Sequence, residues 1–294
     1  MKIGSACADP IFLSLLVPVT PGFIECRRYE LQLDPAPKRS PSLLGSHYPN
    51  FVEWQGYVII MIDRGGGVQM LNEQDRRKKA VGEEAAALVK DGMKVGLGSG
   101  STVYWLIRKL GELVKTGLKI EGIPSSDQTA HWANEFGVPL TDFTKVKELD
   151  ITIDGADEVD EDLHLIKGGG AALFREKVIA QAAKELIIIV DSSKMVTNLG
   201  KFPLPIEVLP FSWERTAHEL SKLGCVPKVR KRDEEILITD NGNYILDCPF
   251  DKISNPAKLN EEINKIIGVI ETGLFIGMAN KIIVGDGETI TIVE

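Results

Sequence analysis

Short apolar segments and helical apolar stripes alternate along residues 70–200. Segments of strand length lie at residues 94–97, 119–123, 149–153 and 186–190. Apolar residues recur with helical spacing at residues 73–90, 101–115, 127–136 and 171–184. Strands that alternate with helices form parallel βαβ units, so the pattern predicts an α/β fold in which helices cover a Rossmann-like parallel sheet.

The pattern changes after Gly200. Strands are predicted at residues 206–209, 226–231, 235–239, 244–247 and 269–275, and helices at 213–223 and 256–267. Asp240-Asn241-Gly242-Asn243 is a strong hairpin signal between two of these strands. The resulting β-α-β-β-α-β order predicts a smaller ferredoxin-like α+β domain inserted in the first. A final hairpin at residues 281–293 returns to the main sheet.

Three regions are expected from these patterns. Residues 1–69 have poor periodicity and many prolines, which predicts a poorly structured N-terminal extension, translated from upstream of a start at Met70. Residues 70–200 and 276–294 are expected to form the catalytic α/β domain, and residues 201–275 the ferredoxin-like domain. Whether residues 1–69 have a role is left open.

Composition and charge limit the partners. The 294 residues carry a net charge of −8 and no long basic run, so no nucleic-acid partner is expected. The apolar run at residues 11–17 is too short to cross a bilayer, so no membrane partner is expected either. The four cysteines form no CxxC pair and the four histidines have no metal-ligand spacing. A reducing cytoplasm and no metal site are therefore expected.

The first candidate site is Gly96-Leu97-Gly98-Ser99-Gly100-Ser101-Thr102, between a predicted strand and a predicted helix. Its glycines let backbone N–H groups approach a ligand, its hydroxyls add donors, and the helix directs its positive end to the same place. The combination suits a phosphate. Neither a Walker loop nor GxGxxG fits, because no Gly-Lys-Ser/Thr is present and Ser101 replaces the last glycine. The alternative is a tight turn with a serine cap.

The second candidate is the acidic segment Asp154-Gly155-Ala156-Asp157-Glu158-Val159-Asp160, which follows a predicted strand. Closely spaced carboxylates repel one another, so a metal, a buried lysine or sugar hydroxyls must offset the repulsion. The spacing differs from that of an EF-hand calcium loop. A solvated acidic loop is the alternative.

The third candidate is Lys167-Gly168-Gly169-Gly170, which opens the predicted helix that carries Glu176. Lys167 can face the carboxylates of Asp154 and Asp157 as well as a substrate oxygen. Between two basic residues, Glu176 has the pattern of a surface glutamate. Lys194, in Asp191-Ser192-Ser193-Lys194, follows a buried strand and can either reach the site or lie in solvent.

The three motifs lie on loops that follow strands of one sheet, where α/β proteins place their sites. Together they supply the parts for proton abstraction next to a carbonyl. The glycine- and serine-rich loop holds a phosphate, a carboxylate moves a proton between adjacent carbons, and a lysine stabilises the enediolate. An aldose–ketose isomerase of a small sugar phosphate is therefore predicted.

Four blocks, GSGST, DGADEVD, KGGGAALFREK and DSSK, stand in an order that resembles the signature of the ribose-5-phosphate isomerase A family, from Met70 to the C-terminus. The resemblance implies interconversion of ribose 5-phosphate and ribulose 5-phosphate in the non-oxidative pentose phosphate pathway. It also implies a cytoplasmic homodimer or homotetramer that needs neither metal nor cofactor.

The resemblance also implies roles for particular residues. Glu176 would shuttle the proton between C1 and C2, while Lys167 and the backbone of Gly168, Gly169 and Gly170 stabilise the enediolate. Asp154 and Asp157, with Gly155 and Ala156 between them, would contact sugar hydroxyls and assist ring opening. Phosphate would be bound by Ser99, Gly100, Ser101, Thr102, Lys194 and Lys78. Whether Lys78 or Lys79 reaches the phosphate, and how strictly ribose 5-phosphate is preferred, is left open.

Three other functions remain as alternatives. One is an isomerase or deaminase of the same fold that acts on an amino-sugar phosphate, because fold alone does not fix substrate. Another is a sugar-phosphate sensor, which would need a DNA-binding helix-turn-helix that the N-terminal segment does not show. The third is a coenzyme A transferase-like protein, which would use a glutamate nucleophile and a larger pocket.

Overall fold

The computed structural model describes residues 11–20, 23–31, 61–62, 68–69, 72–287 and 289–294. Residues 1–68 and 69–294 form separate units. In the first, β1 (Ile11–Thr20) and β2 (Phe23–Leu31) pair antiparallel. A short pair, β3 (Met61–Ile62) and β4 (Val68–Gln69), follows. The predicted lack of structure before Met70 falls mostly outside the described residues, and the sequence did not predict the β1–β2 pair.

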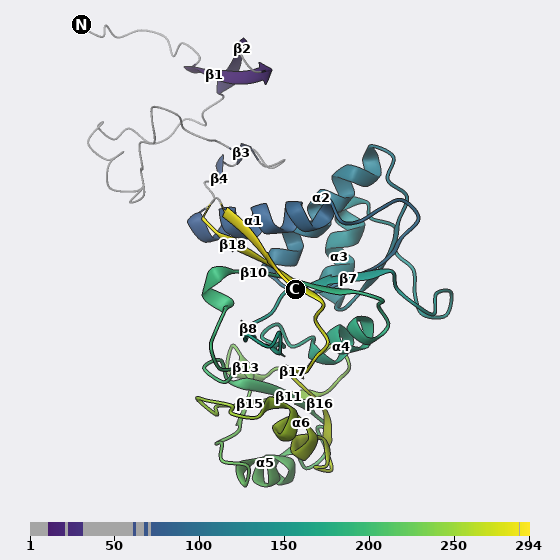
Figure 1. The fold of residues 1–294 in the computed structure, drawn as a ribbon, viewed down its shortest axis with the longest axis vertical. Coiled ribbons are helices and arrows are strands. Elements are labelled where there is room, and N and C mark those ends of the chain that lie inside the picture. The colour runs from purple at the N-terminus through teal and green to yellow at the C-terminus, as the bar shows by residue number, and fades with distance from the viewer. Residues whose placement is uncertain (1–10, 21–22, 32–60, 63–67, 70–71, 288) are drawn as a thin grey trace, which may run out of the picture. The chain divides into compact units, whose positions relative to one another are not determined.

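The second unit is organised around a six-stranded sheet in the order β19-β18-β10-β7-β5-β6 (Figure 1). Its strands are β5 (Lys94–Leu97), β6 (Glu121–Pro124), β7 (Ile151–Asp154), β10 (Leu186–Asp191), β18 (Lys281–Asp286) and β19 (Thr289–Val293). Only the edge strand β19 runs antiparallel to its neighbour. Every residue of β10 is buried, as its continuous apolar run predicts for a central parallel strand.

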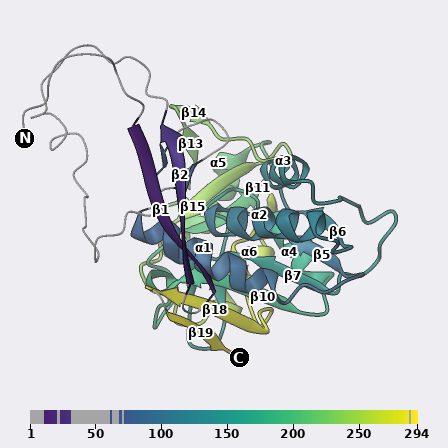
Figure 2. The ribbon, with the colours of Figure 1, turned by 90° about the horizontal axis from the view of Figure 1, so that it is seen from above.

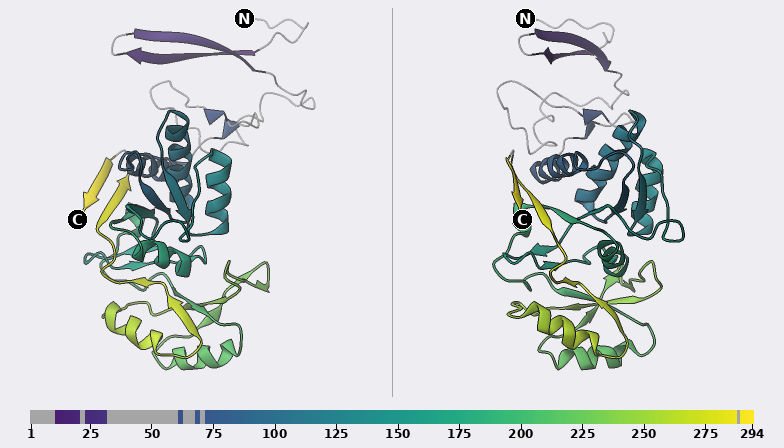
Figure 3. Two further views of the ribbon diagram at one scale, coloured as in Figure 1. Left: turned by 90° about the vertical axis from the view of Figure 1, so that its right-hand side faces the viewer. Right: turned by 45° about the vertical axis from the view of Figure 1, so that its right-hand side comes forward.

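The main sheet is covered by α1 (Glu73–Ala86), α2 (Ser101–Lys115), α3 (Asp127–Phe136) and α4 (Leu173–Gln181). Helix α1 packs against α2, β10 and β18, and α2 packs against α3 (Figure 2). Helix α4 contacts β5 and β7 of the main sheet and also strands of the smaller sheet (Figure 3). The predicted α/β fold with a parallel sheet is confirmed.

The smaller sheet has the order β12-β15-β11-β16 and is antiparallel throughout. Its elements are β11 (Leu204–Val208), α5 (Trp213–Ser221), β12 (Lys228–Val229), β15 (Tyr244–Cys248), α6 (Pro256–Asn264) and β16 (Val269–Thr272). This is the ferredoxin-like order that the sequence predicts. A short hairpin, β13 (Lys231–Arg232) and β14 (Glu235–Ile236), interrupts it. The domain boundaries at residues 200 and 276 stay a prediction, since residues 69–294 form one unit.

A third, small sheet joins β17 (Leu274–Phe275), β9 (Leu165–Ile166) and β8 (Glu158–Val159). The sequence predicted neither β8 nor β9, and it predicted one strand over residues 269–275. The structure breaks that strand at Gly273, whose carbonyl accepts a hydrogen bond from the Lys167 N–H at 2.9 Å. A Cβ on Gly273 would collide with the carbonyl of Lys167. The break therefore lets two backbones approach closely beside the candidate site.

No helix in the described part of the chain is long and apolar enough to cross a membrane.

Candidate active site

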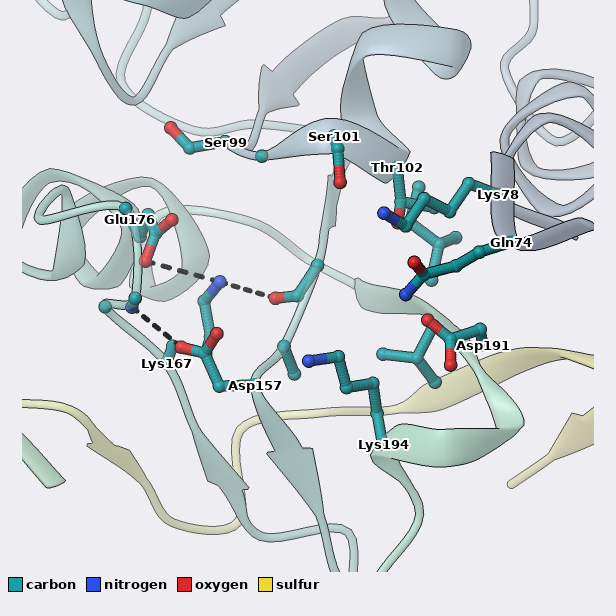
Figure 4. Close-up of a pocket in the computed structure, with 18 residues that line it drawn as sticks. Gln74, Lys78, Ser99, Ser101, Thr102, Asp157, Lys167, Glu176, Asp191 and Lys194 are labelled. Atoms are coloured by element: carbon teal, nitrogen blue, oxygen red, sulfur yellow. Dashed lines mark hydrogen bonds and ion pairs between the residues drawn. The ribbon is translucent and has the colours of Figure 1, made fainter. Parts of the chain in front are cut away.

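A cavity of about 170 Å³ opens where β5, β7 and β10 end, at the carboxyl edge of the main sheet (Figure 4). This is where α/β sheets place their ligands. The cavity is lined by every predicted site residue except Asp154: Lys78, Ser99, Gly100, Ser101, Thr102, Gly155, Ala156, Asp157, Lys167, Gly168, Gly169, Gly170, Glu176 and Lys194. Segments that are more than a hundred positions apart in the sequence thus meet at one site.

The loop between β5 and α2 forms one wall. Gly100 adopts a φ of 103°, which favours glycine, and it precedes the first turn of α2. No side chain of the described residues caps that turn, so its N–H groups remain available for a ligand anion. Gly98 is also required as glycine, because a Cβ there would collide with the carboxylate of Asp154. The hydroxyls of Ser101 and Thr102 lie beside this turn (Figure 4).

Lys78 on α1 and Lys194 in the 3₁₀ turn η2 (Ser192–Lys194) both line the cavity, and their side chains extend into it from different elements (Figure 4). Neither lysine has an ion-pair partner among the residues that the structure describes. Their charges are thus available to an anionic ligand. Lys79, the other candidate, pairs with Glu83 at 3.7 Å and does not line the cavity. Of these two lysines, Lys78 is thus the one that the structure brings to the cavity.

The side chain of Ser99 lies differently from the prediction. Its hydroxyl contacts the hydroxyls of Ser125, Ser126 and Thr129, at 2.8, 3.0 and 3.3 Å, and Figure 4 shows it directed away from Ser101 and Thr102. Its backbone N–H donates to Asp154 Oδ1 at 2.9 Å. Ser99 thus shapes the loop, and its hydroxyl is not directed to the turn that carries Ser101 and Thr102.

A buried cluster of charges forms the other end of the cavity. Lys167 Nζ lies 2.9 Å from Asp154 Oδ2 and 3.3 Å from Glu176 Oε2, and it donates to the carbonyl of Gly155. The side chains of Lys167, Asp154 and Glu176 are 3, 1 and 5 % exposed. Lys167 is thus ion-paired with both carboxylates, although Asp154 Oδ2 and Glu176 Oε2 accept no hydrogen bond from the described residues. Figure 4 shows the Lys167 ammonium group between the Glu176 carboxyl group and the carbonyl of Gly155.

Asp154 is thus placed behind the cavity wall rather than in it. Its Oδ1 accepts hydrogen bonds from the N–H groups of Ser99 and Gly155, at 2.9 and 2.7 Å, and its Oδ2 faces Lys167. Since β7 ends at Asp154, its side chain lies beneath the loop between β5 and α2. The structure brings Asp157, and not Asp154, to the wall of the cavity.

Burial shifts the proton affinities of this cluster. Burial raises the pKa of Glu176 to about 8, against the charge of Lys167, which lowers it, and Asp154 adds to the rise. Burial by itself would lower the pKa of Lys167, but the charges of Asp154 and Glu176 outweigh that effect and raise the pKa. Lys167 therefore remains a cation, while Glu176 can exchange a proton near neutral pH.

The remaining acids of the segment 154–160 are held by backbone N–H groups. Asp157 Oδ2 accepts from the N–H of Gly169 at 2.7 Å. Glu158 accepts from residues 200 and 202, and Asp160 from residues 162 and 164. These N–H donors and the ammonium group of Lys167 offset the repulsion between the closely spaced carboxylates of the segment 154–160. No group of three or more His, Cys, Asp or Glu in the described residues is arranged to hold a metal ion.

Besides Ile189 and Val190 of β10, two polar residues that line the cavity, Gln74 and Asp191, were not predicted. Gln74 lies one turn before Lys78 on α1, so the two share a helix face. Asp191 ends β10, and its Oδ1 accepts from the N–H of Ser193 at 3.1 Å. Both have a signal in the sequence: the four-residue spacing to Lys78 for Gln74, and a position at the end of a buried strand for Asp191.

The fold and the site define an α/β enzyme that binds a small anionic molecule and acts on it by proton transfer. The sequence profile of the family described as ribose 5-phosphate isomerase A (phosphoriboisomerase A) matches residues 121–289. The chain belongs to this family.

Known members match the chain closely. Ribose-5-phosphate isomerase A 1 of Oceanobacillus iheyensis is 73% identical over 223 residues, which are 76% of this chain and 100% of that protein. Among solved structures, a D-ribose-5-phosphate isomerase in complex with phospho-erythronic acid is 41% identical, with a TM-score of 0.73, over 76% of this chain and 100% of the other. Ribose 5-phosphate isomerase A of Methanocaldococcus jannaschii is 38% identical, with a TM-score of 0.72, over 75% and 99%.

Proposed function

We propose that this chain interconverts D-ribose 5-phosphate and D-ribulose 5-phosphate, the aldose–ketose isomerisation of the non-oxidative pentose phosphate pathway. Its membership of the ribose 5-phosphate isomerase A family supports this reaction. The observation that carries the proposal is the buried Glu176–Lys167 pair, which faces the anion-binding end of the same cavity. An intramolecular oxidoreductase needs a base, a cation and a fixed substrate, and this cavity has groups for all three.

The phosphate of the sugar would bind at the first turn of α2. The N–H groups of that turn, the hydroxyls of Ser101 and Thr102, and the ammonium groups of Lys78 and Lys194 are suited to a doubly charged anion. Holding the phosphate fixes one end of the sugar. The opposite end, where the reacting carbons C1 and C2 lie, is thereby directed to Lys167 and Glu176.

The proton transfer then follows from the positions of these groups. The Glu176 carboxylate removes the proton from C2 of the open-chain aldose, and the electron pair of that bond forms the C1–C2 double bond of an enediolate. The negative charge develops on the oxygen at C1, where the Lys167 ammonium stabilises it. The hydroxyl proton on the C2 oxygen then passes to the C1 oxygen, and Glu176 returns its proton to C1, which gives the ketose. Asp157, at the cavity wall, is suited to move the protons on oxygen.

The raised pKa of Glu176 suits this cycle, because a carboxyl group that titrates near neutral pH can both accept and return a proton. A related D-ribose-5-phosphate isomerase has been solved in complex with phospho-erythronic acid, which supports a sugar phosphate as the substrate of this chain. That molecule has a phosphate at one end and a carboxylate at the other. In this chain the phosphate would occupy the turn of α2, and the carboxylate would take the place of the enediolate beside Lys167.

Two further properties belong to this proposal. The family resemblance supports a cytoplasmic enzyme that assembles as a homodimer or homotetramer, and the mass in solution, measured by light scattering, tests the assembly.

Ketose formation from ribose 5-phosphate, run beside ribose and glucosamine 6-phosphate, tests the reaction. We expect turnover of ribose 5-phosphate alone. Turnover of glucosamine 6-phosphate would instead support an enzyme of amino-sugar phosphates, and binding without turnover would support a sensor.

A further inference from the structure

Lys177, the residue after Glu176 on α4, is buried beside the site without lining it. Its Nζ donates hydrogen bonds to Glu271 Oε1 and to the carbonyls of Thr272 and Leu274, each at 2.8 Å. It also lies 4.8 Å from the centroid of the Phe275 ring. Its side chain is 14 % exposed. Three directed bonds from one buried ammonium group fix α4 to the segment 271–274.

The same segment also holds Lys167. The carbonyl of Gly273, between the two that bind Lys177, accepts from the backbone N–H of Lys167 at 2.9 Å. Strand β17 continues the contact, with Leu274 opposite Ile166 of β9. Successive carbonyls of one segment therefore hold the backbone of Lys167 and the side chain of Lys177.

Glu176 and Lys167 face each other at 3.3 Å across this arrangement. Helix α4 begins at Ala172 without a side-chain cap from the described residues, so its first turn is not fixed in that way. We propose that Lys177 is a positioning residue, which ties α4 to the segment 271–274 and thereby sets the position of Glu176 against Lys167. The inference rests on the proposed role of Glu176 as the base.

The charges around Glu176 determine what loss of this tie would do. Lys167, Asp154 and Asp157 act on its carboxyl group. Of the two small-sheet strands that contact α4, β16 carries Glu271, which binds Lys177, and β11 carries Glu207, which binds Thr239, Asn241 and Asn243. If α4 shifts, two opposing influences on the pKa of Glu176 change together: burial, which raises the pKa, and the charge of Lys167, which lowers it. The pKa of Glu176 should then differ from that in the parent enzyme.

The experiment compares Lys177→Met with the parent enzyme in the isomerisation of ribose 5-phosphate. We expect kcat to fall about tenfold or more, because small displacements of a catalytic group are costly. The KM should stay within about twofold, since the phosphate-binding groups are on other elements. The acid limb of the pH profile of kcat/KM should move away from its position in the parent enzyme, and Lys177→Arg should restore part of kcat.

Lys184→Met is the matched control. Lys184 follows α4 and pairs with Asp150 at 2.8 Å, but its side chain is 64 % exposed and it does not line the cavity. It should leave kcat, KM and the pH profile unchanged. If Lys177→Met does not fold, Glu271→Gln provides a milder test, because it keeps both carbonyl acceptors of Lys177. We expect the same changes there, but smaller.

Glu176→Gln, assayed in parallel, separates the two proposals. Full turnover in Glu176→Gln would show that Glu176 is not the base and would overturn the proposed mechanism. A different outcome would overturn the positioning role alone. In that outcome Glu176→Gln is inactive, but Lys177→Met folds, keeps the parental kcat and shows no shift of the acid limb. A Lys177→Met enzyme that loses thermal stability but keeps its kcat and pH profile would show that Lys177 is merely structural.

Discussion

The two ends of the cavity differ in how their charged side chains are paired and buried. At one end Asp154, Lys167 and Glu176 are almost fully buried, and their charges are matched to one another. At the other end Lys78 and Lys194 are partly exposed, and no carboxylate in the described chain is paired with either. Burial shifts pKa values at the first end, whereas the second end leaves positive charge for a ligand. This difference supports the proposal that the first end carries the chemistry and that the second end binds the substrate.

The largest effect is expected at the buried end, from Glu176→Gln. The amide has nearly the shape of the carboxyl group but cannot accept the proton from C2, so kcat should fall by at least ~10²-fold. Substrate binding should persist, because the groups for the phosphate are untouched. Steady-state kinetics and calorimetric titration with ribose 5-phosphate measure the two quantities. Near-normal turnover would show that chemistry is not located at this end.

The pH profile examines the same end without a mutation. Burial raises the pKa of Glu176 to about 8, and the base works in its deprotonated form. The value of kcat/KM should therefore rise with pH and level off above about 8, with a change of about tenfold per pH unit on the acid side. The substrate phosphate itself titrates near ~6, so the position of the limb separates the two groups. A limb at ~6 alone would contradict the raised pKa.

Substitutions at the other end of the cavity, where Lys78 and Lys194 lie, should change KM. Lys78→Met removes one ammonium group from the phosphate while it keeps the apolar stem of the side chain, so we expect KM to rise about tenfold with kcat nearly unchanged. Lys79→Met is the matched control, because Lys79 is its neighbour on α1 and pairs with Glu83 instead. If Lys79→Met raised KM and Lys78→Met did not, Lys79 rather than Lys78 would be the lysine that binds the phosphate.

The sequence predicted those elements whose signals are local. Helices α2 and α3 begin and end where they were predicted, because an apolar stripe runs through the first and the Ser126 cap and Gly137 bound the second. Strands β8, β9 and β17 span two residues each, which is too short for a periodic pattern. Their pairing depends on contacts between distant segments, so it could be found only in the structure.

The site shows the same limit. Motifs identify which loops converge, but not where a side chain points. Ser99 and Asp154 belong to the predicted loops, yet one hydroxyl joins a buried polar cluster and one carboxylate lies behind the wall. Glu176 has a surface pattern, between Arg175 and Lys177, and it is buried only because α4 contacts strands of both sheets. Tertiary packing, which is not encoded in any short motif, decides its role.

The smallest effect, none at all, is expected from exhaustive chelation. A metal would be needed only if the acids of the segment 154–160 lacked other partners. Lys167 and backbone N–H groups already bind those carboxylates, with Asp154 held by two such groups and Lys167. Dialysis against a chelator should therefore leave kcat and KM unchanged. Activity that is lost in the chelator and restored by a divalent cation would mean that the charges of the buried end are matched by an ion rather than by the chain itself.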